Sequence, residues 1–208
     1  MIAQFFTVGL VVLLGAMLPG PDFAIVAKNS LLHSRRSGLF TSLGVVCATL
    51  VHMSYCVLGL ALVISESIVF FNLIKYVGAL YLIYLGIQSF LTKTPQQLVS
   101  LDPKAKHSAQ SNSLSFRQGF LCNLLNPKAT LFFLALFTVL IKPDTPLGWE
   151  LIFALEICVV AFLWFCSLTF ILSHSRVKRL LEKAEKYISK LLGVFLVGFG
   201  FALAFVDK

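Results

Sequence analysis

Six long runs of hydrophobic residues alternate with short polar segments along the chain. Each run has about 20 residues or more, the length that an α-helix needs to cross the hydrocarbon core of a bilayer. Helices satisfy their own backbone hydrogen bonds, which lipid cannot do for them. The pattern therefore predicts an all-α membrane protein with six transmembrane helices. The predicted helices cover residues 4–27, 39–64, 68–91, 116–141, 147–173 and 187–206.

The composition agrees with this pattern. Hydrophobic residues make up 58% of the chain and charged residues 12%, whereas an ordinary soluble domain carries about 25% charged residues. So little charge cannot cover a water-exposed globule of this size. Residues 1–27 contain no Lys or Arg, so we expect a retained first span rather than a signal peptide, which begins with a basic region. We expect residues 1–208 to form one transmembrane domain.

The basic residues indicate how the chain is oriented. Most of the 17 Lys and Arg residues lie in three connections, at 28–38, 92–117 and 174–190. These connections share one side of the membrane if all six runs cross it. The positive-inside rule makes that side cytoplasmic and places both termini on the other side. A net charge of +8 arranged in this way reflects topology, so we expect no nucleic-acid partner.

The one long polar connection, residues 92–115, is rich in Thr, Pro, Gln, Ser and Asn and predicts a cytoplasmic linker. It separates a first half, 1–91, from a second half, 116–208, with three predicted helices each. Because three is odd, related halves must be inverted in the membrane. Two matches in the same order favour such a repeat. They are Pro21-Asp22 with Pro127-Lys128, and Lys75-x-x-Gly78 with Lys190-x-x-Gly193.

The first helix is interrupted by Pro19-Gly20-Pro21-Asp22. Each proline removes a backbone donor and clashes with the carbonyl four residues earlier, and the carbonyls that lose their partners must face protein, water or a ligand. One interpretation is a kink in which Asp22 caps the following helix. The other is a broken helix that lines a substrate cavity.

The fourth helix is interrupted by Asn126-Pro127-Lys128. This break lies about ten residues into its run, which is about 15 Å by helical rise. A charge at that depth is costly and usually faces a transport pathway or a partner. Snorkelling toward the interface is the alternative. We favour the functional interpretation for this lysine.

Four further residues are candidates for a proton relay or for lining a cavity. Glu156 and His52 lie inside predicted spans, and each can carry a proton. A hydrogen-bonded core position is the alternative for His52. Lys75 is close to the end of its span, where snorkelling explains it, and Tyr81 either lines a cavity or packs.

No motif for a nucleotide, a dinucleotide, zinc or a catalytic nucleophile is present in the sequence. The five cysteines all lie in apolar runs without a C-x-x-C spacing. We therefore predict no catalytic residues, no metal site, no cofactor and no enzymatic activity. Glycine-rich helix faces permit a homodimer but do not require one.

Three segments, taken in order, resemble the LysE/RhtB family of amino-acid exporters. They are Leu18 to Asp22, Lys75 to Gly86 and Asn123 to Ala129, and the segment from Gly193 to Gly200 also fits. The resemblance covers essentially the whole chain. It implies a multi-pass protein of the bacterial inner membrane that expels amino acids using the proton-motive force. In that membrane the orientation given by the positive-inside rule makes both termini periplasmic. The form Pro19-Gly20-Pro21-Asp22 is more similar to the threonine/homoserine branch than to the lysine branch.

A free amino acid is a zwitterion, so its site needs an acceptor for the ammonium and donors for the carboxylate. We predict that Asp22 holds the ammonium, while Lys128 and the free amides of the broken fourth helix hold the carboxylate. Alternatively, Asp22 and Lys128 pair with each other and open for substrate. Competing functions are export of a metal ion or another small solute on the same architecture, or a non-transporting membrane scaffold.

Overall fold

A computed structural model describes residues 2–66, 68–91, 110–140, 145–172, 187, 190–191, 193–198 and 200–201. In this part of the chain every regular element is an α-helix, as the hydrophobic pattern predicts. The helices are α1 (Ile2–Met17), α2 (Pro21–Leu32), α3 (Arg35–Glu66), α4 (Ile68–Leu91), α5 (Asn112–Leu124), α6 (Pro127–Leu140) and α7 (Leu147–Leu172).

Two of the apolar runs form bent pairs of helices. The axis turns by 63° between α1 and α2 and by 59° between α5 and α6. A proline opens the second helix of each pair, Pro21 in α2 and Pro127 in α6. Proline is well tolerated at the first helical position, where no amide partner is lost, but it cannot continue a preceding helix. Both predicted helix breaks are confirmed.

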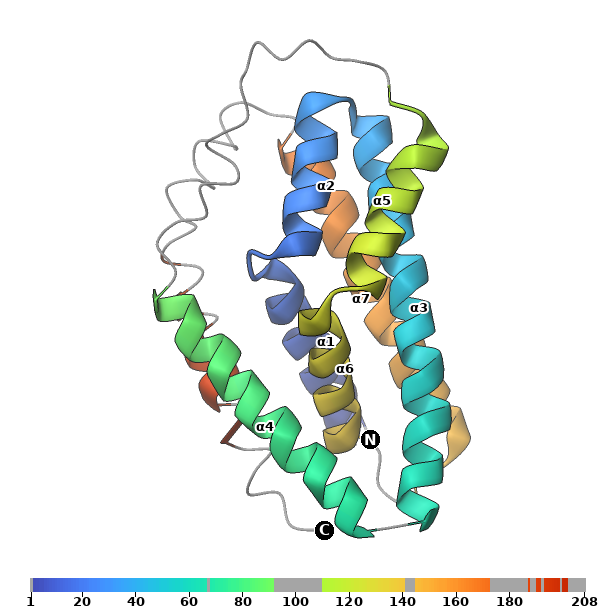
Figure 1. The fold of residues 1–208 in the computed structure, drawn as a ribbon, viewed down its shortest axis with the longest axis vertical. Coiled ribbons are helices and arrows are strands. Elements are labelled where there is room, and N and C mark those ends of the chain that lie inside the picture. The colour runs from blue at the N-terminus through green and yellow to red at the C-terminus, as the bar shows by residue number, and fades with distance from the viewer. Residues whose placement is uncertain are drawn as a thin grey trace.

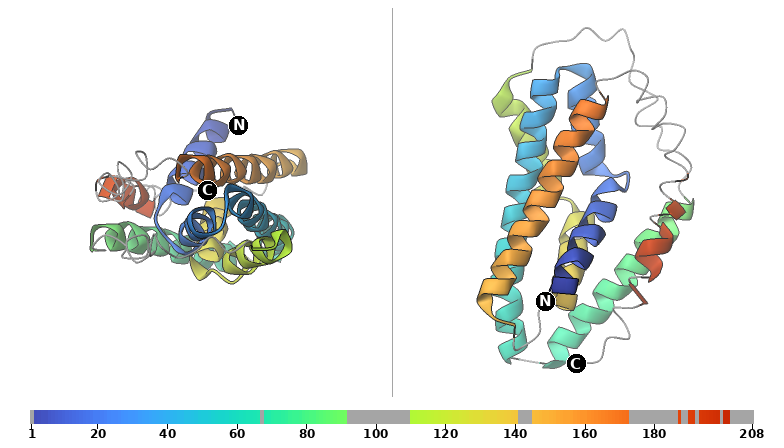
Figure 2. Two further views of the ribbon diagram at one scale, coloured as in Figure 1. Left: turned by 90° about the horizontal axis from the view of Figure 1, so that it is seen from above. Right: turned by 180° about the vertical axis from the view of Figure 1, so that it is seen from behind.

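The bent pairs run in opposite directions. Figure 1 shows α2 and α5 together in the upper half of the molecule and α1 and α6 in the lower half. Helices α3 and α7 run along almost the whole length beside them (Figure 2). Helix α3 packs on α2, α5 and α6, while α7 packs on α1 and α2. Each long helix therefore contacts the bent pair of the other half of the chain, and α3 also contacts α2 of its own half.

Two helices are long and apolar enough to cross a bilayer by themselves, over Arg35–Leu58 and Leu147–Leu172. Counting each bent pair as one span raises the number to four among the described residues. The predicted third span corresponds to α4 (Ile68–Leu91), a helix of 24 mostly apolar residues. Within the predicted sixth span, residues 193–198 are helical, and the remainder lies partly outside the described residues. The count of six spans therefore stays a prediction.

The predicted linker 92–115 falls mostly outside the described residues, but its last part is helical. Helix α5 begins at Asn112 rather than at residue 116. Ser111 is the reason, because its Oγ accepts a hydrogen bond from the Leu114 amide at 3.2 Å. A serine at this position satisfies an amide that would otherwise lack a partner at the helix start.

Close backbone contacts at glycines hold the upper half together. Gly44 of α3 lies against the Phe116 carbonyl of α5, and Gly119 of α5 lies against the Thr41 carbonyl of α3. A Cβ at either glycine would collide with backbone atoms. Small residues let helices approach in this way in membranes, so the two glycines fix the α3–α5 pair from both sides.

Helix α4 is joined to residues 193–200 by the same device. A Cβ on Gly86 would lie 2.6 Å from the Gly193 carbonyl oxygen, and one on Gly200 would lie 2.8 Å from the Ala79 carbonyl oxygen. The views in Figures 1 and 2 place these segments side by side at the edge of the molecule. The described part of the last apolar run therefore packs on α4.

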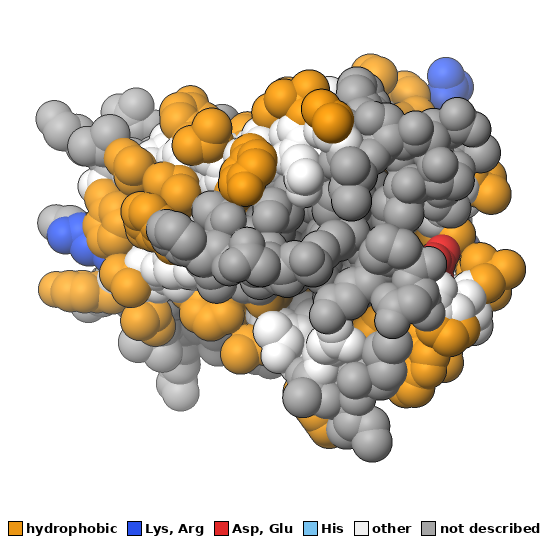
Figure 3. Space-filling model, turned by 90° about the horizontal axis from the view of Figure 1, so that it is seen from below, with side chains coloured by type: hydrophobic (Ala, Val, Ile, Leu, Met, Phe, Trp, Pro, Cys, Tyr) orange, Lys and Arg blue, Asp and Glu red, His pale blue; other side chains and the backbone are white. Residues whose placement is uncertain are grey.

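Large apolar side chains cover the outside of the helices. Leu58, Val69, Leu80, Leu155 and Leu163 are each more than half exposed. The space-filling view shows hydrophobic side chains predominating among the described residues, with few charged ones (Figure 3). Such a surface suits lipid and would be unstable in water.

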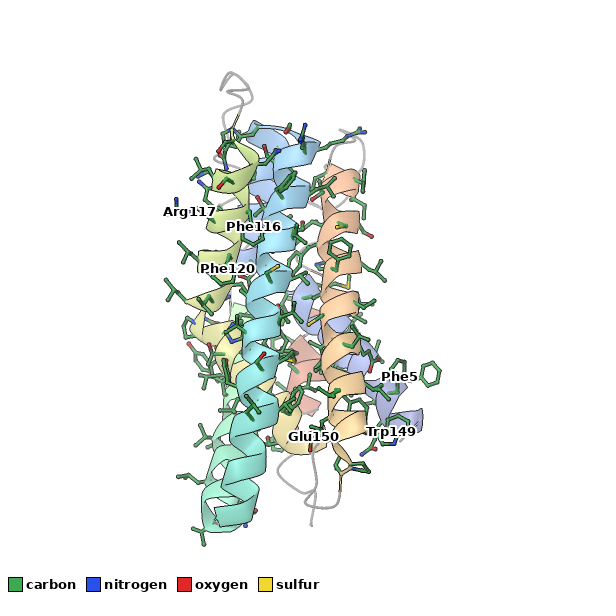
Figure 4. The ribbon with its side chains drawn as sticks, turned by 90° about the vertical axis from the view of Figure 1, so that its right-hand side faces the viewer. Phe5, Phe116, Arg117, Phe120, Trp149 and Glu150 are labelled. Atoms are coloured by element: carbon green, nitrogen blue, oxygen red, sulfur yellow. The ribbon has the colours of Figure 1, made fainter. Side chains whose placement is uncertain are left out.

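The two ends of the molecule differ in charge. Arg35 and Arg36 open α3 beside the end of α2, and Arg117 lies near the start of α5. Figure 4 shows Arg117 toward this end, and Trp149 and Glu150 at the other. A basic end and an end that carries Trp are what a multi-pass membrane protein presents to its two interfaces.

Candidate functional site

The two helix breaks lie on one cavity, which has a volume of about 610 Å³ with its open mouth included. Residues from α1 to α7 contribute to its wall. The lining consists of Val12, Gly15, Ala16, Leu18, Gly20, Pro21, Asp22, Phe23, Thr49, Leu85, Asn123, Asn126, Lys128, Ala129, Phe132, Phe133, Ala161 and Phe165.

The cavity includes many of the residues predicted at the breaks. Gly20, Pro21 and Asp22 of the first break and Asn126 and Lys128 of the second line it. Pro19 and Pro127 do not; their contribution is to end one helix and to begin the next. Gly20 has an extended backbone, with φ of −175°, and its carbonyl oxygen accepts a hydrogen bond from the Ala24 amide at 2.9 Å at the start of α2.

Asp22 is held from the opposite half of the chain. Its Oδ2 accepts hydrogen bonds from Asn123 Nδ2 at 3.0 Å and from Asn126 Nδ2 at 2.9 Å. Its Oδ1 is buried and has no hydrogen-bond partner among the described residues. The start of α2 has no side-chain cap, so Asp22 does not cap that helix. The carboxylate instead joins the two breaks and keeps one oxygen available.

Asn126 has two roles at the second break. Its Oδ1 accepts from the Lys128 amide at 3.0 Å, while its Nδ2 donates to Asp22. The Lys128 amide is thus already satisfied, so it is not one of the free amides that the sequence predicted at this helix. The uncapped helix start at the cavity belongs to α2.

Lys128 brings its ammonium to the first break. A Cβ on Gly20 would lie 3.1 Å from Lys128 Nζ, so glycine at this position leaves room for the ammonium. No ion pair within 4.0 Å links Asp22 and Lys128 in the part of the chain that the structure describes. The two charges share a cavity without contacting each other directly.

Asn123 is a member of the site that sequence reasoning did not select. It lies at the end of α5, three residues before Asn126, and its Oδ1 is buried without a partner. The sequence does contain a pattern that could have indicated it, because two asparagines three residues apart in an apolar run would face the same side of a helix. The amide nitrogen of Asn123 binds Asp22, and its amide oxygen adds a second unpaired acceptor.

His52 stands behind this network and does not line the cavity. Its Nε2 lies 3.2 Å from the Asn123 backbone oxygen, and its Nδ1 is hydrogen-bonded to the Tyr55 hydroxyl. The ring also packs on Phe133, with centroids 5.6 Å apart. His52 is therefore a buried, hydrogen-bonded residue, which is the alternative that the sequence left open for it. Its ring contacts the Asn123 carbonyl next to the second break.

The remaining candidates lie away from the cavity. Glu156 is buried on α7 with Oε2 unpartnered, and its Oε1 faces Gly9 of α1. Tyr81 is partly buried and packs beside the core, with its ring 6.1 Å from that of Tyr84. Lys75 belongs to α4, and its side chain lies outside the described residues.

Polar and apolar groups are separated within the cavity. The breaks supply one carboxylate, one ammonium, an unpaired amide oxygen and the uncapped start of α2. Apart from Thr49 the rest of the wall is apolar, and it includes four phenylalanines. Such a cavity can bind a small molecule with one cationic and one anionic group and an uncharged remainder.

Comparison with known proteins decides the family. A profile of the LysE type translocators matches residues 13–206. The chain belongs to the LysE type translocator family. The expected resemblance is thereby confirmed, and the translocator is a multi-pass membrane protein.

Several curated proteins are similar to the translocator over most of their length. An uncharacterized membrane protein of Bacillus subtilis, YrhP, is 35% identical, with 88% of this chain and 90% of that protein covered. The threonine efflux protein of Escherichia coli K12 is 32% identical over 98% of both chains. The leucine efflux protein of Klebsiella pneumoniae is 32% identical, with 90% of the translocator and 88% of that protein covered. No solved structure matches the translocator.

Proposed function

We propose that this translocator exports neutral amino acids, such as threonine or homoserine, from the cytoplasm in exchange for protons. Family membership supports amino-acid efflux at the level of the family, and two similar proteins are named for threonine and leucine efflux. Residues Pro19 to Asp22 and Asn126 to Lys128 form the transport site in this proposal, with the prolines breaking the helices and the polar side chains binding.

The observation that carries the proposal is the meeting of Asp22 and Lys128 at one cavity from two separate helix breaks. The free Oδ1 of Asp22 and the Asn123 amide oxygen accept hydrogen bonds from the substrate ammonium. Lys128 Nζ and the uncapped start of α2 bind the carboxylate, since a helix start presents free amides and positive potential. The alternative is that Asp22 and Lys128 pair directly with each other and open for substrate.

The proposed architecture is six transmembrane helices in two inverted halves, as the opposite directions and similar bends of the two broken pairs support. In inverted repeats, substrate sites form where broken helices meet near the bilayer midplane. The end with Arg35, Arg36 and Arg117 faces the cytoplasm in this proposal, because basic residues concentrate there. Both termini then lie in the periplasm of a bacterial inner membrane.

Glu156 is the proposed proton-binding group. It is 8% exposed, one of its oxygens has no partner, and α1, which covers it at Gly9, carries no charged side chain. An isolated carboxylate at such a position is costly unless it binds a proton. In this proposal protonation of Glu156 acts on Asp22 through α1, which lies against Glu156 at Gly9 and ends just before the first break.

Transport into proteoliposomes tests the function. We expect labelled threonine, homoserine and leucine to be transported in response to an imposed pH gradient, and lysine to be transported much less. Glu156→Gln should retain exchange of substrate across the membrane while losing the response to the gradient. If the purified protein moves none of these amino acids, the proposed function is wrong.

Charge-neutralising variants test the site. Asp22→Asn and Lys128→Gln each remove one charge-assisted interaction, worth about 1.5–3 kcal/mol, so kcat/KM should fall roughly 10- to 100-fold. Lys28→Gln is the matched control, because Lys28 is exposed on α2 outside the cavity. Full transport by both site variants would contradict the assignment of Asp22 and Lys128.

A further inference from the structure

Beyond the breaks, one part of the cavity wall is entirely apolar, and we call this part the apolar compartment. Its residues come from α1, α6 and α7 and carry no charge. Four of them are buried: Val12, Phe132, Ala161 and Phe165. The compartment comprises Val12, Gly15, Ala16, Phe132, Ala161 and Phe165.

One contact defines the boundary of this compartment. A Cβ on Gly15 would lie 2.6 Å from Cζ and 2.8 Å from Cε2 of Phe132, whereas carbon atoms prefer separations of about 3.5–4.0 Å. The edge of the Phe132 ring therefore rests directly on the backbone of α1. Only glycine at position 15 lets the ring extend from α6 to α1 at this point.

The Phe132 ring is also held from behind. It packs edge-to-face on Phe133, with centroids 5.5 Å apart and planes at 71°. Phe133 in turn packs on His52. A ring fixed between α1 and a second aromatic side chain is a rigid wall, so it restricts the size of whatever fills the compartment.

We infer that this compartment receives the side chain of the transported amino acid, selects an uncharged and mainly apolar one, and has its depth set by the Gly15–Phe132 contact. The inference rests on the proposed function, because Asp22 and Lys128 are assigned to the ammonium and the carboxylate. With both charges used there, the described lining offers nothing to neutralise a charged side chain. An unpaired charge buried in such a compartment would cost several kcal/mol.

Thr49 adds a single hydroxyl to the cavity wall. Its Oγ1 donates to the Val45 carbonyl oxygen at 3.1 Å, so its lone pairs remain to accept a hydrogen bond. A substrate hydroxyl that donates to Thr49 is compatible with the same site, whereas a second ammonium or carboxylate is not. The substrate class is thus the amino acids with apolar or hydroxylated, uncharged side chains.

Two variants change the compartment in opposite directions. Gly15→Ala forces the Phe132 ring away from α1 and into the cavity, so the ratio of phenylalanine to alanine transport should fall. Phe132→Leu shortens the wall, so this ratio should rise. We expect changes of roughly tenfold, the discrimination that about one methylene gives in an apolar pocket. In the double variant the shorter leucine leaves room for the new methyl, and the ratio should return toward the wild-type value.

Two glycine variants serve as controls in the same assay. Gly78→Ala crowds Ala135 of α6 at 2.7 Å but lies outside the cavity lining, and Gly148 has nothing within 4 Å. Neither substitution should alter the ratio. Where Gly15→Ala does not fold, as judged by size-exclusion chromatography in detergent, Phe132→Leu alone decides the outcome.

The results separate the two levels of the proposal. Wild-type protein that moves no amino acid refutes the proposed function. Wild-type transport with a phenylalanine-to-alanine ratio that Phe132→Leu leaves unchanged, or that Gly78→Ala shifts as strongly as Gly15→Ala, refutes only the compartment. Transport of lysine or glutamate as efficient as that of leucine also refutes the compartment, because the compartment is inferred to exclude charged side chains.

Discussion

Asn126 carries two hydrogen bonds that can be separated by mutation. Asn126→Ala removes both the acceptor for the Lys128 amide and the donor to Asp22. Asn126→Ser retains a good acceptor at the start of α6 but is too short to reach the Asp22 carboxylate. The serine variant therefore loses one contact and the alanine variant loses two.

The expected loss of stability follows from the kind of contact that each variant removes. The bond to Asp22 is 2.9 Å long and joins an amide to a buried carboxylate, and such charge-assisted bonds contribute about 1.5–3 kcal/mol. The cap on α6 contributes about 1 kcal/mol. We expect Asn126→Ser to destabilise the protein by about 1.5–3 kcal/mol, and Asn126→Ala to destabilise it by about 1 kcal/mol more.

Chemical denaturation in detergent micelles, followed by tryptophan fluorescence, measures these differences. Trp164 and Trp149 both lie on α7, so their fluorescence reports on unfolding away from the mutated position. Transport should fall in the same order, because Asp22 loses one of its two donors in both variants. Equal stability of the serine and alanine variants would refute the capping role, and wild-type stability of both would refute the whole account of Asn126.

Two further predictions concern packing around the breaks. Gly44→Ala should strongly reduce the yield of folded protein, because the new methyl collides with the Phe116 carbonyl and the Phe120 amide of α5. Gly148→Ala should behave as wild type when the two variants are compared by size-exclusion chromatography. His52→Leu should lower kcat/KM by a few-fold with folding intact, because the Asn123 carbonyl loses a partner 3.2 Å away and a typical hydrogen bond contributes about 0.5–1.5 kcal/mol. His52→Gln should recover part of the loss. Unchanged kinetics in both variants would show that His52 only fills space.

The breaks and the long helices were predictable because each has a strong local cause. Proline cannot donate the hydrogen bond that a helix interior requires, so Pro21 and Pro127 mark helix starts in any context. Long apolar runs such as Leu147–Leu172 form helices because lipid allows them little else. That Lys128 and the first break share one site was also implied by the matching positions of the two breaks in the two halves of the sequence.

Other features depend on contacts between distant residues and could not be predicted in this way. The donation from Asn123 to Asp22 spans 101 positions in the chain, and nothing local to Asn123 indicates its partner. The same is true of Glu156, which sequence reasoning grouped with the site but which faces Gly9 across the α1–α7 interface. The position of Phe132 over Gly15 likewise follows from how α1 and α6 pack and not from either helix alone.

The unpaired groups of the cavity lead to one last prediction, about the substrate itself. Asp22 Oδ1 and Asn123 Oδ1 lack donors, and the nearby ammonium of Lys128 forms no ion pair within 4.0 Å in the described part of the chain. A zwitterion supplies both missing partners at once. An amine without the carboxylate would leave Lys128 unpaired, and an acid without the ammonium would leave Asp22 unpaired, and removing one partner of a buried ion pair costs about 3–5 kcal/mol.

Analogues of leucine that lack one group measure this difference. We expect isopentylamine and 4-methylpentanoate to compete with labelled leucine at least 100-fold more weakly than leucine does, since 1.4 kcal/mol corresponds to a factor of ten. In Lys128→Gln the amine should regain most of its relative affinity, and in Asp22→Asn the acid should do so, because the charge that each analogue leaves unpaired is then absent. If both analogues compete as well as leucine in the wild-type protein, the two charges do not bind the substrate, and the cavity would then bind the apolar side chain alone.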